Sequence, residues 1–438
     1  MIEPSKTNQV SDSGGAQDSP GKALKILLCV LVLFIPYQYH FPRNLGIPGM
    51  NPANLLFLVI FLLLPKRSFP NDPAPLKGFF FFFIFALTVS VLVSQFKGGV
   101  SADADIVRYK DVCFWMLLYF LYYRAVQDEA TIVLLLKMMA LVTFIASLHG
   151  IRQAIDYGIG VYVEERRASG PFGADFRGAN AASIFYVMFM PIALSALVQY
   201  RSQLKLRLIC GIFIAAAILA IFVTYSRQAY FILAALFVII FLRRKPILLP
   251  FVLVALLTYE AWVPEGVVKR IQMTNQGDEY SEKKFDESTE SRWIIWEGAI
   301  KLIQEQPEGV GLQRFSLEIG RYVPMYENMD AHNGFVLFAT EAGLLGFIAM
   351  VSLFVRLIFF GRAAELIDDD ERTKIIGAAY MLSAIAMCMG NLYGSRFFNG
   401  EIMGNFWIFT ALVARYSMLR REHLKTVNKD TIEISRAR

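Results

Sequence analysis

Two apolar stretches decide the fold class of this chain. Residues 79–93 read FFFFFIFALTVSVLV, and residues 207–224 read RLICGIFIAAAILAIFVT. Runs this long with almost no charge predict membrane-spanning helices. The whole chain follows the same trend, because 56% of its 438 residues are apolar and 18% are charged. This composition excludes a soluble enzyme, a disordered protein and a nucleic-acid module, and solid apolar runs do not fit an outer-membrane barrel.

Hydropathy along the chain predicts an all-α polytopic membrane protein with about twelve transmembrane helices. The predicted spans lie near residues 24–39, 52–65, 78–95, 111–124, 130–150, 181–199, 207–224, 228–242, 246–263, 333–358, 374–392 and 402–418.

Composition changes divide the chain into five parts. Residues 1–21, rich in Ser, Gly, Asp and Pro, are predicted to be a disordered cytoplasmic tail. Residues 22–263 hold the first nine spans, residues 264–332 form a long extracytoplasmic loop, and residues 333–418 hold the last three spans. Residues 419–438 are predicted to be a second cytoplasmic tail.

Lysines and arginines in the short loops predict the orientation. Under a twelve-span count all the clusters fall on one side, which places both termini in the cytoplasm. These clusters are Lys66-Arg67; Arg201, Lys205 and Arg207; Arg243-Arg244-Lys245; Arg356, Arg362, Arg372 and Lys374; and Arg415, Arg420, Arg421 and Lys425.

Two loops on the opposite side are long, at about 151–180 and 264–333. Within the second loop Trp293, Trp296, Ile300 and Ile303 follow one another at helical spacing. They predict an amphipathic helix at the membrane–water interface, ended by the Pro307 to Gly309 segment.

Three residues near the predicted extracytoplasmic face could carry chemistry. Arg227 sits in a break between two apolar runs, Arg292 opens the amphipathic segment, and His332 precedes a span. Taken singly, each has an ordinary structural explanation: a snorkelling arginine, a solvated arginine and a helix cap. Taken together, two arginines suit a diphosphate, and a histidine suits deprotonation of a hydroxyl group. A diphosphate site at a lipid surface suggests a polyprenyl-diphosphate substrate.

No motif indicates a cofactor or a metal site. The sequence has no P-loop, GxSxG, HExxH or CxxC motif, and its four cysteines all fall inside predicted spans without metal-ligand spacing. ATP-driven transport by this chain alone is therefore not expected.

An ordered set of short motifs resembles the O-antigen ligase and O-antigen polymerase superfamily (WaaL and Wzy types). The set, clearest over residues 210–350, comprises Ser226-Arg227-Gln228-Ala229, Ser291-Arg292-Trp293-Ile294-Ile295-Trp296, Pro307-Glu308-Gly309-Val310-Gly311, His332-Asn333 and Glu341-Ala342-Gly343-Leu344-Leu345-Gly346. The segment from Gly170 to Asn180 resembles a further part of the family pattern.

The resemblance implies a GT-C-like glycosyltransferase of the bacterial inner membrane that acts in lipopolysaccharide biosynthesis. Its donor would be an undecaprenyl-diphosphate-linked glycan on the periplasmic face and its acceptor a sugar hydroxyl of the lipid A-core type, with inversion and without a metal ion. By motif position, Arg227 and Arg292 would bind the diphosphate and His332 would be the base. Arg314, Arg396 and Asn333 are possible additional site residues.

The residues leave other functions open. A polymerase of the same superfamily would share the donor site and differ only in the acceptor. We favour the ligase because one loop dominates, whereas polymerases often use two large loops. A lipid-linked sugar transporter needs charges near the membrane midplane, but here they cluster at one face. A structural scaffold would not need the arginine–histidine set.

Overall fold

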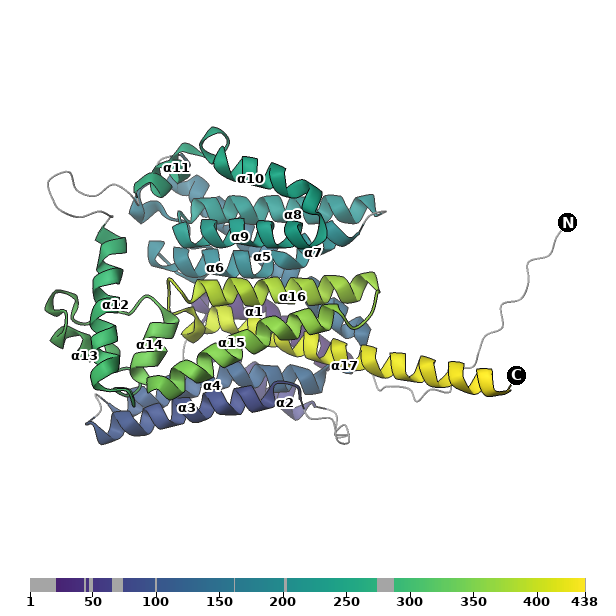
Figure 1. Cartoon of the computed structure of the whole chain (residues 1–438), viewed down its shortest axis with the longest axis horizontal. Coiled ribbons are helices and arrows are strands. Elements are labelled where there is room, and N and C mark those ends of the chain that lie inside the picture. Colours follow the sequence, from purple (N-terminus) through teal and green to yellow (C-terminus); the bar gives the residue numbers. More distant parts are fainter. Residues whose placement is uncertain are drawn as a thin grey trace.

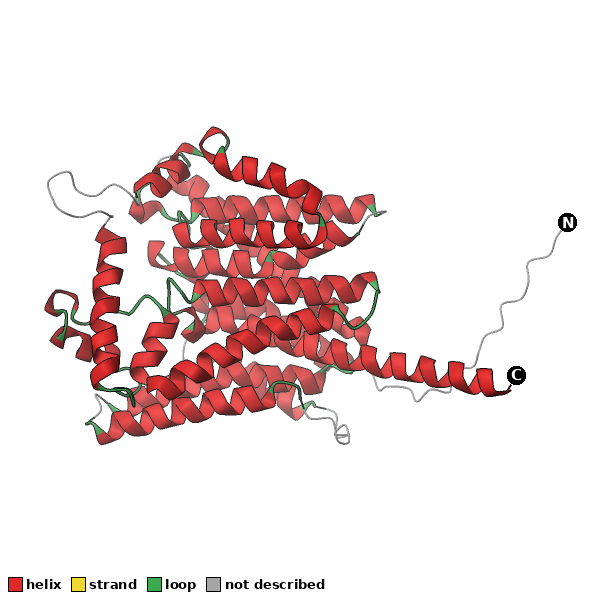
Figure 2. Cartoon of the chain, in the orientation of Figure 1, coloured by secondary structure: helices red, strands yellow, loops and turns green. Residues whose placement is uncertain are grey.

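The computed structural model describes residues 21–42, 45–46, 50–64, 74–98, 101–160, 162–200, 203–273 and 287–437. In these residues every regular element is a helix (Figure 2). The predicted disordered tail at 1–21 lies outside them except for Gly21, and so do Lys66, Arg67 and Arg201.

Ten α-helices lie within the described part of the first 257 residues. They are α1 (Lys22–Phe34), α2 (Pro52–Leu62), α3 (Lys77–Phe96), α4 (Ala102–Ala125), α5 (Glu129–Tyr157), α6 (Ala179–Phe189), α7 (Pro191–Gln199), α8 (Leu204–Val223), α9 (Arg227–Arg244) and α10 (Leu249–Leu257).

The described residues after 257 form α11 (Glu265–Gln272), α12 (Glu287–Glu305), α13 (Phe315–Glu318), α14 (Gly334–Glu341), α15 (Gly343–Glu365), α16 (Glu371–Gly390) and α17 (Gly400–Ala437). The 3-10 helices used below are η1 (Ile35–His40), η3 (Gly170–Phe172) and η10 (Arg396–Phe398).

The protein is a multi-pass membrane protein. By length and composition, eight helices in the described chain could cross a membrane, and each overlaps one of the twelve predicted spans. Two other predicted spans, at 52–65 and 246–263, form the shorter apolar helices α2 and α10. The remaining two form α4 and α9, whose sequences carry more charge, including Arg227, Arg243 and Arg244 in α9.

The predicted span at 333–358 is two helices rather than one. The chain breaks between α14 and α15, where Gly343 has a left-handed φ of 65°. A Cβ at Gly343 would lie 2.4 Å from the carbonyl carbon of Glu308, so only glycine permits this approach. Leu344 N–H donates to the Pro307 carbonyl at 3.0 Å, and Val310 N–H to the Thr340 carbonyl at 2.9 Å. Hydropathy alone cannot reveal this break, because both helices are apolar.

Helix α17 extends further than its predicted span at 402–418. It continues through the predicted tail to Ala437. Arg415, which the sequence placed among the tail cations, is instead 1% exposed, and its Nε donates to the Val126 carbonyl at 2.8 Å. A backbone carbonyl just after α4 therefore explains this arginine, and a basic surface cluster does not.

The amphipathic helix exists as α12, and it ends at Glu305, just before Pro307. Figure 1 shows α12 standing across one end of the bundle, while α17 leaves the opposite end. Within the protein α12 buries the side chains of Ile295, Ala299 and Leu302, whereas Trp293 and Ile300 of the predicted interface face are about half exposed. The placement of that face at the membrane–water interface stays a prediction.

Candidate active site

The candidate site is a cavity of about 520 Å³ beside α12. Its volume suits a small-molecule site. Arg227, Arg292 and His332, which the sequence selected from three separate segments, all line this cavity. Helix α6 begins one residue before the lining residue Asn180, and α9 begins at Arg227. The positive ends of these two helix dipoles therefore favour an anion in the cavity.

The lining has more positive than negative side chains. Among the described residues, its arginines are Arg167, Arg227, Arg270 and Arg292, and its acidic residues are Glu164 and Glu287. Burial, followed by the nearby Arg227, lowers the pKa of Arg270. The Nε of Arg270 is buried without a hydrogen-bond acceptor among the described residues. Clustered guanidinium groups of this kind suit a phosphate-bearing ligand, which would supply the missing acceptors.

Sequence reasoning missed Arg167 and Arg270. Arg167, which is 5% exposed, donates to Glu164 Oε1 and Asn180 Oδ1, both at 2.6 Å, and to the Thr224 carbonyl at 2.9 Å. It thus joins the shorter loop to the start of α6 and the end of α8. Arg270 lies over the Tyr162 ring at 4.6 Å. The pair Arg166-Arg167 in a predicted extracytoplasmic loop was the available signal, whereas Arg270 had no motif around it.

His332 is held in place from both sides along the chain. Its φ is 50°, a left-handed conformation that non-glycine residues rarely adopt and that often marks a functional site. On one side, Trp296 Nε1 of α12 donates to the Ala331 carbonyl at 2.8 Å. On the other side, Asn333 caps α14, because its Oδ1 accepts from the N–H groups of Phe335 and Val336. Asn333 therefore positions the histidine and is not among the cavity-lining residues.

Burial and charged neighbours shift the pKa of His332. Its Nδ1 lies 3.7 Å from Asp330 Oδ2, and Asp330 is itself held by Ser395 Oγ at 3.0 Å. Burial lowers the pKa of His332 below its ordinary value; Asp330 opposes this shift, and Arg292 and Arg396 add to it. The imidazole is therefore neutral at pH 7 and able to accept a proton.

Of the other two candidate arginines, one lies close to the site and one lies apart. Arg396, in η10, interacts electrostatically with Asp330 and Arg292, and burial lowers its pKa to about 10. Arg314 forms an ion pair with Glu318 at 3.0 Å and donates to the Lys97 carbonyl at 3.0 Å. Arg314 does not line the cavity, and its contacts join the long loop to the end of α3.

The relative placement of Arg292 and His332 depends on the glycine segment after α12. Gly309, with a φ of 95°, approaches the α14–α15 junction so closely that a Cβ there would lie 2.6 Å from Gly343 N. This contact fixes the end of α12 against the helix that follows His332. Tyr393 completes the assembly, because its ring packs on Trp296 at 5.6 Å and lies 5.8 Å from the Arg292 guanidinium.

Comparison with known proteins gave a match to part of the chain. Residues 210–351 match a family model described as O-antigen ligase. No curated protein matches the chain. The matched region contains Arg227, Arg292 and His332 together with both segments that meet at Gly309 and Gly343. Together with the polytopic helical fold, this match over part of the chain supports the resemblance to the O-antigen ligase and O-antigen polymerase superfamily.

Proposed function

We propose that the protein transfers a glycan from undecaprenyl diphosphate to a sugar hydroxyl at the periplasmic face of a bacterial inner membrane. The observation that carries this proposal is the single cavity in which His332 meets four arginines. The arginines suit a diphosphate, and the neutral histidine suits an acceptor hydroxyl group.

In the proposed reaction, His332 accepts the proton of the acceptor hydroxyl while its oxygen bonds to the anomeric carbon of the donor sugar. The bond between that carbon and the diphosphate oxygen breaks, and undecaprenyl diphosphate leaves with both bonding electrons. Arg227 and Arg292 stabilise the charge that develops on the leaving group. Direct displacement of this kind inverts the anomeric carbon. The positive field of the arginines makes a divalent cation unnecessary in this proposal.

A second, apolar cavity supports a lipid-linked donor. It has a volume of about 380 Å³ and lies between α8, α9, α10 and α11. Tyr230 and Ile271, which line it, lie close in sequence to Arg227 and Arg270 of the arginine-lined cavity. A polyprenyl chain in this cavity would therefore reach the membrane from a diphosphate held by the arginines.

The choice between ligase and polymerase concerns the acceptor alone. The dominance of the loop at 264–332 favours a ligase that uses lipid A-core. The participation of Arg167 and Asn180 favours the second candidate, a polymerase, because the shorter loop then also helps to build the site. A transporter is less well supported, since the cationic side chains line a cavity beside α12, at one end of the bundle (Figure 1).

Reconstitution tests the proposal. Purified full-length protein in lipid nanodiscs is incubated with undecaprenyl-diphosphate glycan and either lipid A-core or a second lipid-linked glycan, and the products are resolved by mass spectrometry. Transfer to lipid A-core identifies a ligase, and chain extension on the lipid carrier identifies a polymerase. Absence of both products, with intact wild-type protein that still binds the donor, would overturn the proposal.

A further inference from the structure

A third cavity, of about 540 Å³, lies on the other side of η10 from the arginine-lined site. It is formed where η1 and the start of α2 meet α4 and the start of α17. Its polar lining includes Gln38, Lys110, Asp111, Asn399 and Glu401. It belongs neither to the arginine-lined site nor to the apolar cavity beneath α11.

The segment around η10 connects this cavity to the arginine-lined site. Tyr393, just before η10, lines the arginine-lined cavity, whereas Phe398 and Asn399, at its end, line the other one. Arg396 lies between them and acts electrostatically on His332. The Arg108 guanidinium of α4 lies over the Phe398 ring at 4.6 Å and interacts electrostatically with Asp330. The segment from Tyr393 to Asn399 therefore runs from one cavity to the other, with Arg396 between them.

The charge of the third cavity differs from that of the arginine-lined one. Its charged lining residues in the described part of the chain are one lysine and two acids, and Lys110 forms an ion pair with Asp111 at 3.4 Å. These described residues offer no surplus positive charge to a phosphate. The amides of Gln38 and Asn399 both donate and accept hydrogen bonds, as a ligand with many hydroxyl groups requires.

One wall of the cavity is a fixed aromatic surface. Trp115 of α4 lies flat against α17, because a Cβ at Gly400 would come within 2.2 Å of its indole ring and one at Gly404 within 2.9 Å. Phe114 contacts Trp115 edge-on at 5.0 Å and lines the same cavity. Aromatic rings beside amides and carboxylates suit the two faces of a sugar ring, whose C–H groups are apolar and whose hydroxyl groups are polar.

We propose that this third cavity binds the uncharged sugar part of a substrate glycan. As a substrate subsite, it rests on the proposed transfer function. The arginines would hold the diphosphate, and the third cavity would hold a sugar chain whose reacting end extends past η10 towards His332. The arginine-lined cavity would thereby recognise the charge of the diphosphate, and the third cavity would recognise the hydroxyl groups of the sugar.

Binding measurements on the full-length protein in nanodiscs test this division without requiring turnover. The probes are inorganic pyrophosphate and a neutral, phosphate-free oligosaccharide released from the O-antigen or core of the same bacterium. We expect Gln38→Ala and Asn399→Ala each to weaken oligosaccharide binding about fivefold, as loss of a hydrogen bond implies, and to leave pyrophosphate binding unchanged. Arg292→Lys should weaken pyrophosphate binding and leave oligosaccharide binding unchanged. Gln304→Ala, which removes an exposed amide of α12, is the matched control.

Unchanged oligosaccharide affinity in both cavity variants, with the proteins correctly folded, would overturn the subsite. Competition by phospholipid vesicles with anionic headgroups would assign the cavity to lipid and overturn it as well. If the oligosaccharide binds as expected but no glycan is transferred, the transfer function fails and the sugar site stands. In an active protein, Asn399→Ala should raise the KM of one sugar substrate while kcat stays near normal.

Discussion

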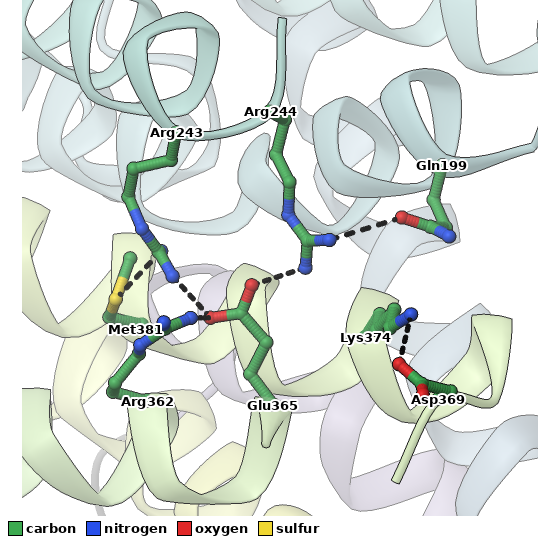
Figure 3. A network of polar contacts seen from close by, with 8 residues as sticks. All are labelled: Gln199, Arg243, Arg244, Arg362, Glu365, Asp369, Lys374 and Met381. Atoms are coloured by element: carbon green, nitrogen blue, oxygen red, sulfur yellow. Dashed lines mark hydrogen bonds and ion pairs between the residues drawn. The ribbon is translucent and has the colours of Figure 1, made fainter.

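Two arginine-rich regions lie at the two ends of α9, and they differ in what neutralises them. At one end, Arg243 and Arg362 contact Glu365 at 2.6 Å and 2.9 Å, and Arg244 also pairs with it (Figure 3). Glu365 is 3% exposed, so the carboxylate is enclosed by its cations. At the other end, about 27 Å away along the 18-residue helix, Arg227 faces a cavity where arginines outnumber acids.

The comparison separates a structural use of arginine from a binding use. In the Glu365 cluster, side chains from α9 and α15 meet in direct ion pairs that join two spans. In the arginine-lined cavity, helix starts and loops surround an open volume, with His332 at its edge. A cluster that surrounds a buried carboxylate needs no ligand, whereas a cavity with surplus positive charge favours an anionic one.

The largest expected effect comes from His332. Replacing it by alanine should lower the transfer rate by about 10²–10⁴-fold, because the acceptor hydroxyl loses its base. Donor binding should remain, since the arginines are unchanged. The measurement is transfer rate and donor affinity on the same purified variant. A folded His332→Ala protein with wild-type turnover would show that His332 is not the base.

Arg292→Lys should lower turnover by about 10²-fold while the protein still folds. A lysine keeps the charge but cannot reproduce two parallel hydrogen bonds to a diphosphate. Arg227→Lys should behave similarly. Arg243→Lys, at the opposite end of α9, is the control and should keep near-normal turnover, because an ammonium can still pair with Glu365. Equal losses at both ends would remove the functional distinction between the two regions.

Glu365→Gln should lower the free energy of unfolding and leave turnover nearly unchanged, which is the opposite of the effect expected for Arg292→Lys. Three arginines then lose their carboxylate, and we expect a loss of about 1–3 kcal/mol, below the cost for a fully buried pair because the arginines are partly exposed. Thermal unfolding in nanodiscs measures the shift. Glu287→Gln, which removes a carboxylate of the arginine-lined cavity, should leave the midpoint nearly unchanged.

The pH dependence should change in opposite directions when single charges near His332 are removed. The rate should fall as pH drops through the lowered pKa of His332, because the imidazolium cannot accept a proton. Asp330→Asn removes an interaction that raises this pKa, so the acidic limb should move to lower pH. Arg396→Gln removes an interaction that lowers it, so the limb should move to higher pH. Full pH–rate profiles of the three proteins check both signs.

The smallest expected effect is that of chelation. Treatment with EDTA should leave turnover unchanged, because arginines rather than a divalent cation neutralise the diphosphate in the proposed reaction. The turnover of Arg292→Lys under the same conditions shows how large a loss a damaged diphosphate site produces. Loss of wild-type activity that magnesium or manganese restores would contradict the prediction.

Much of this protein could be predicted from local sequence. The apolar runs predicted the spanning helices, because about 20 such residues form one membrane crossing whatever surrounds them. Helical spacing predicted α12, and motif order selected Arg227, Arg292 and His332. The break before Gly343 was not predictable from hydropathy, since it results from contact with Pro307 and Glu308, more than thirty residues earlier.

Only the tertiary structure decided which cations share a cavity. The sequence treated Arg314 and Arg396 alike. In the structure Arg314 pairs with Glu318 and donates to the Lys97 carbonyl at the end of α3, whereas Arg396 interacts electrostatically with His332. Arg167 and Arg270 come from two different loops, and no local pattern joins them to Arg227. The physical reason is that a side chain's charge is local to the sequence, but the field at a cavity sums over every segment that folds around it.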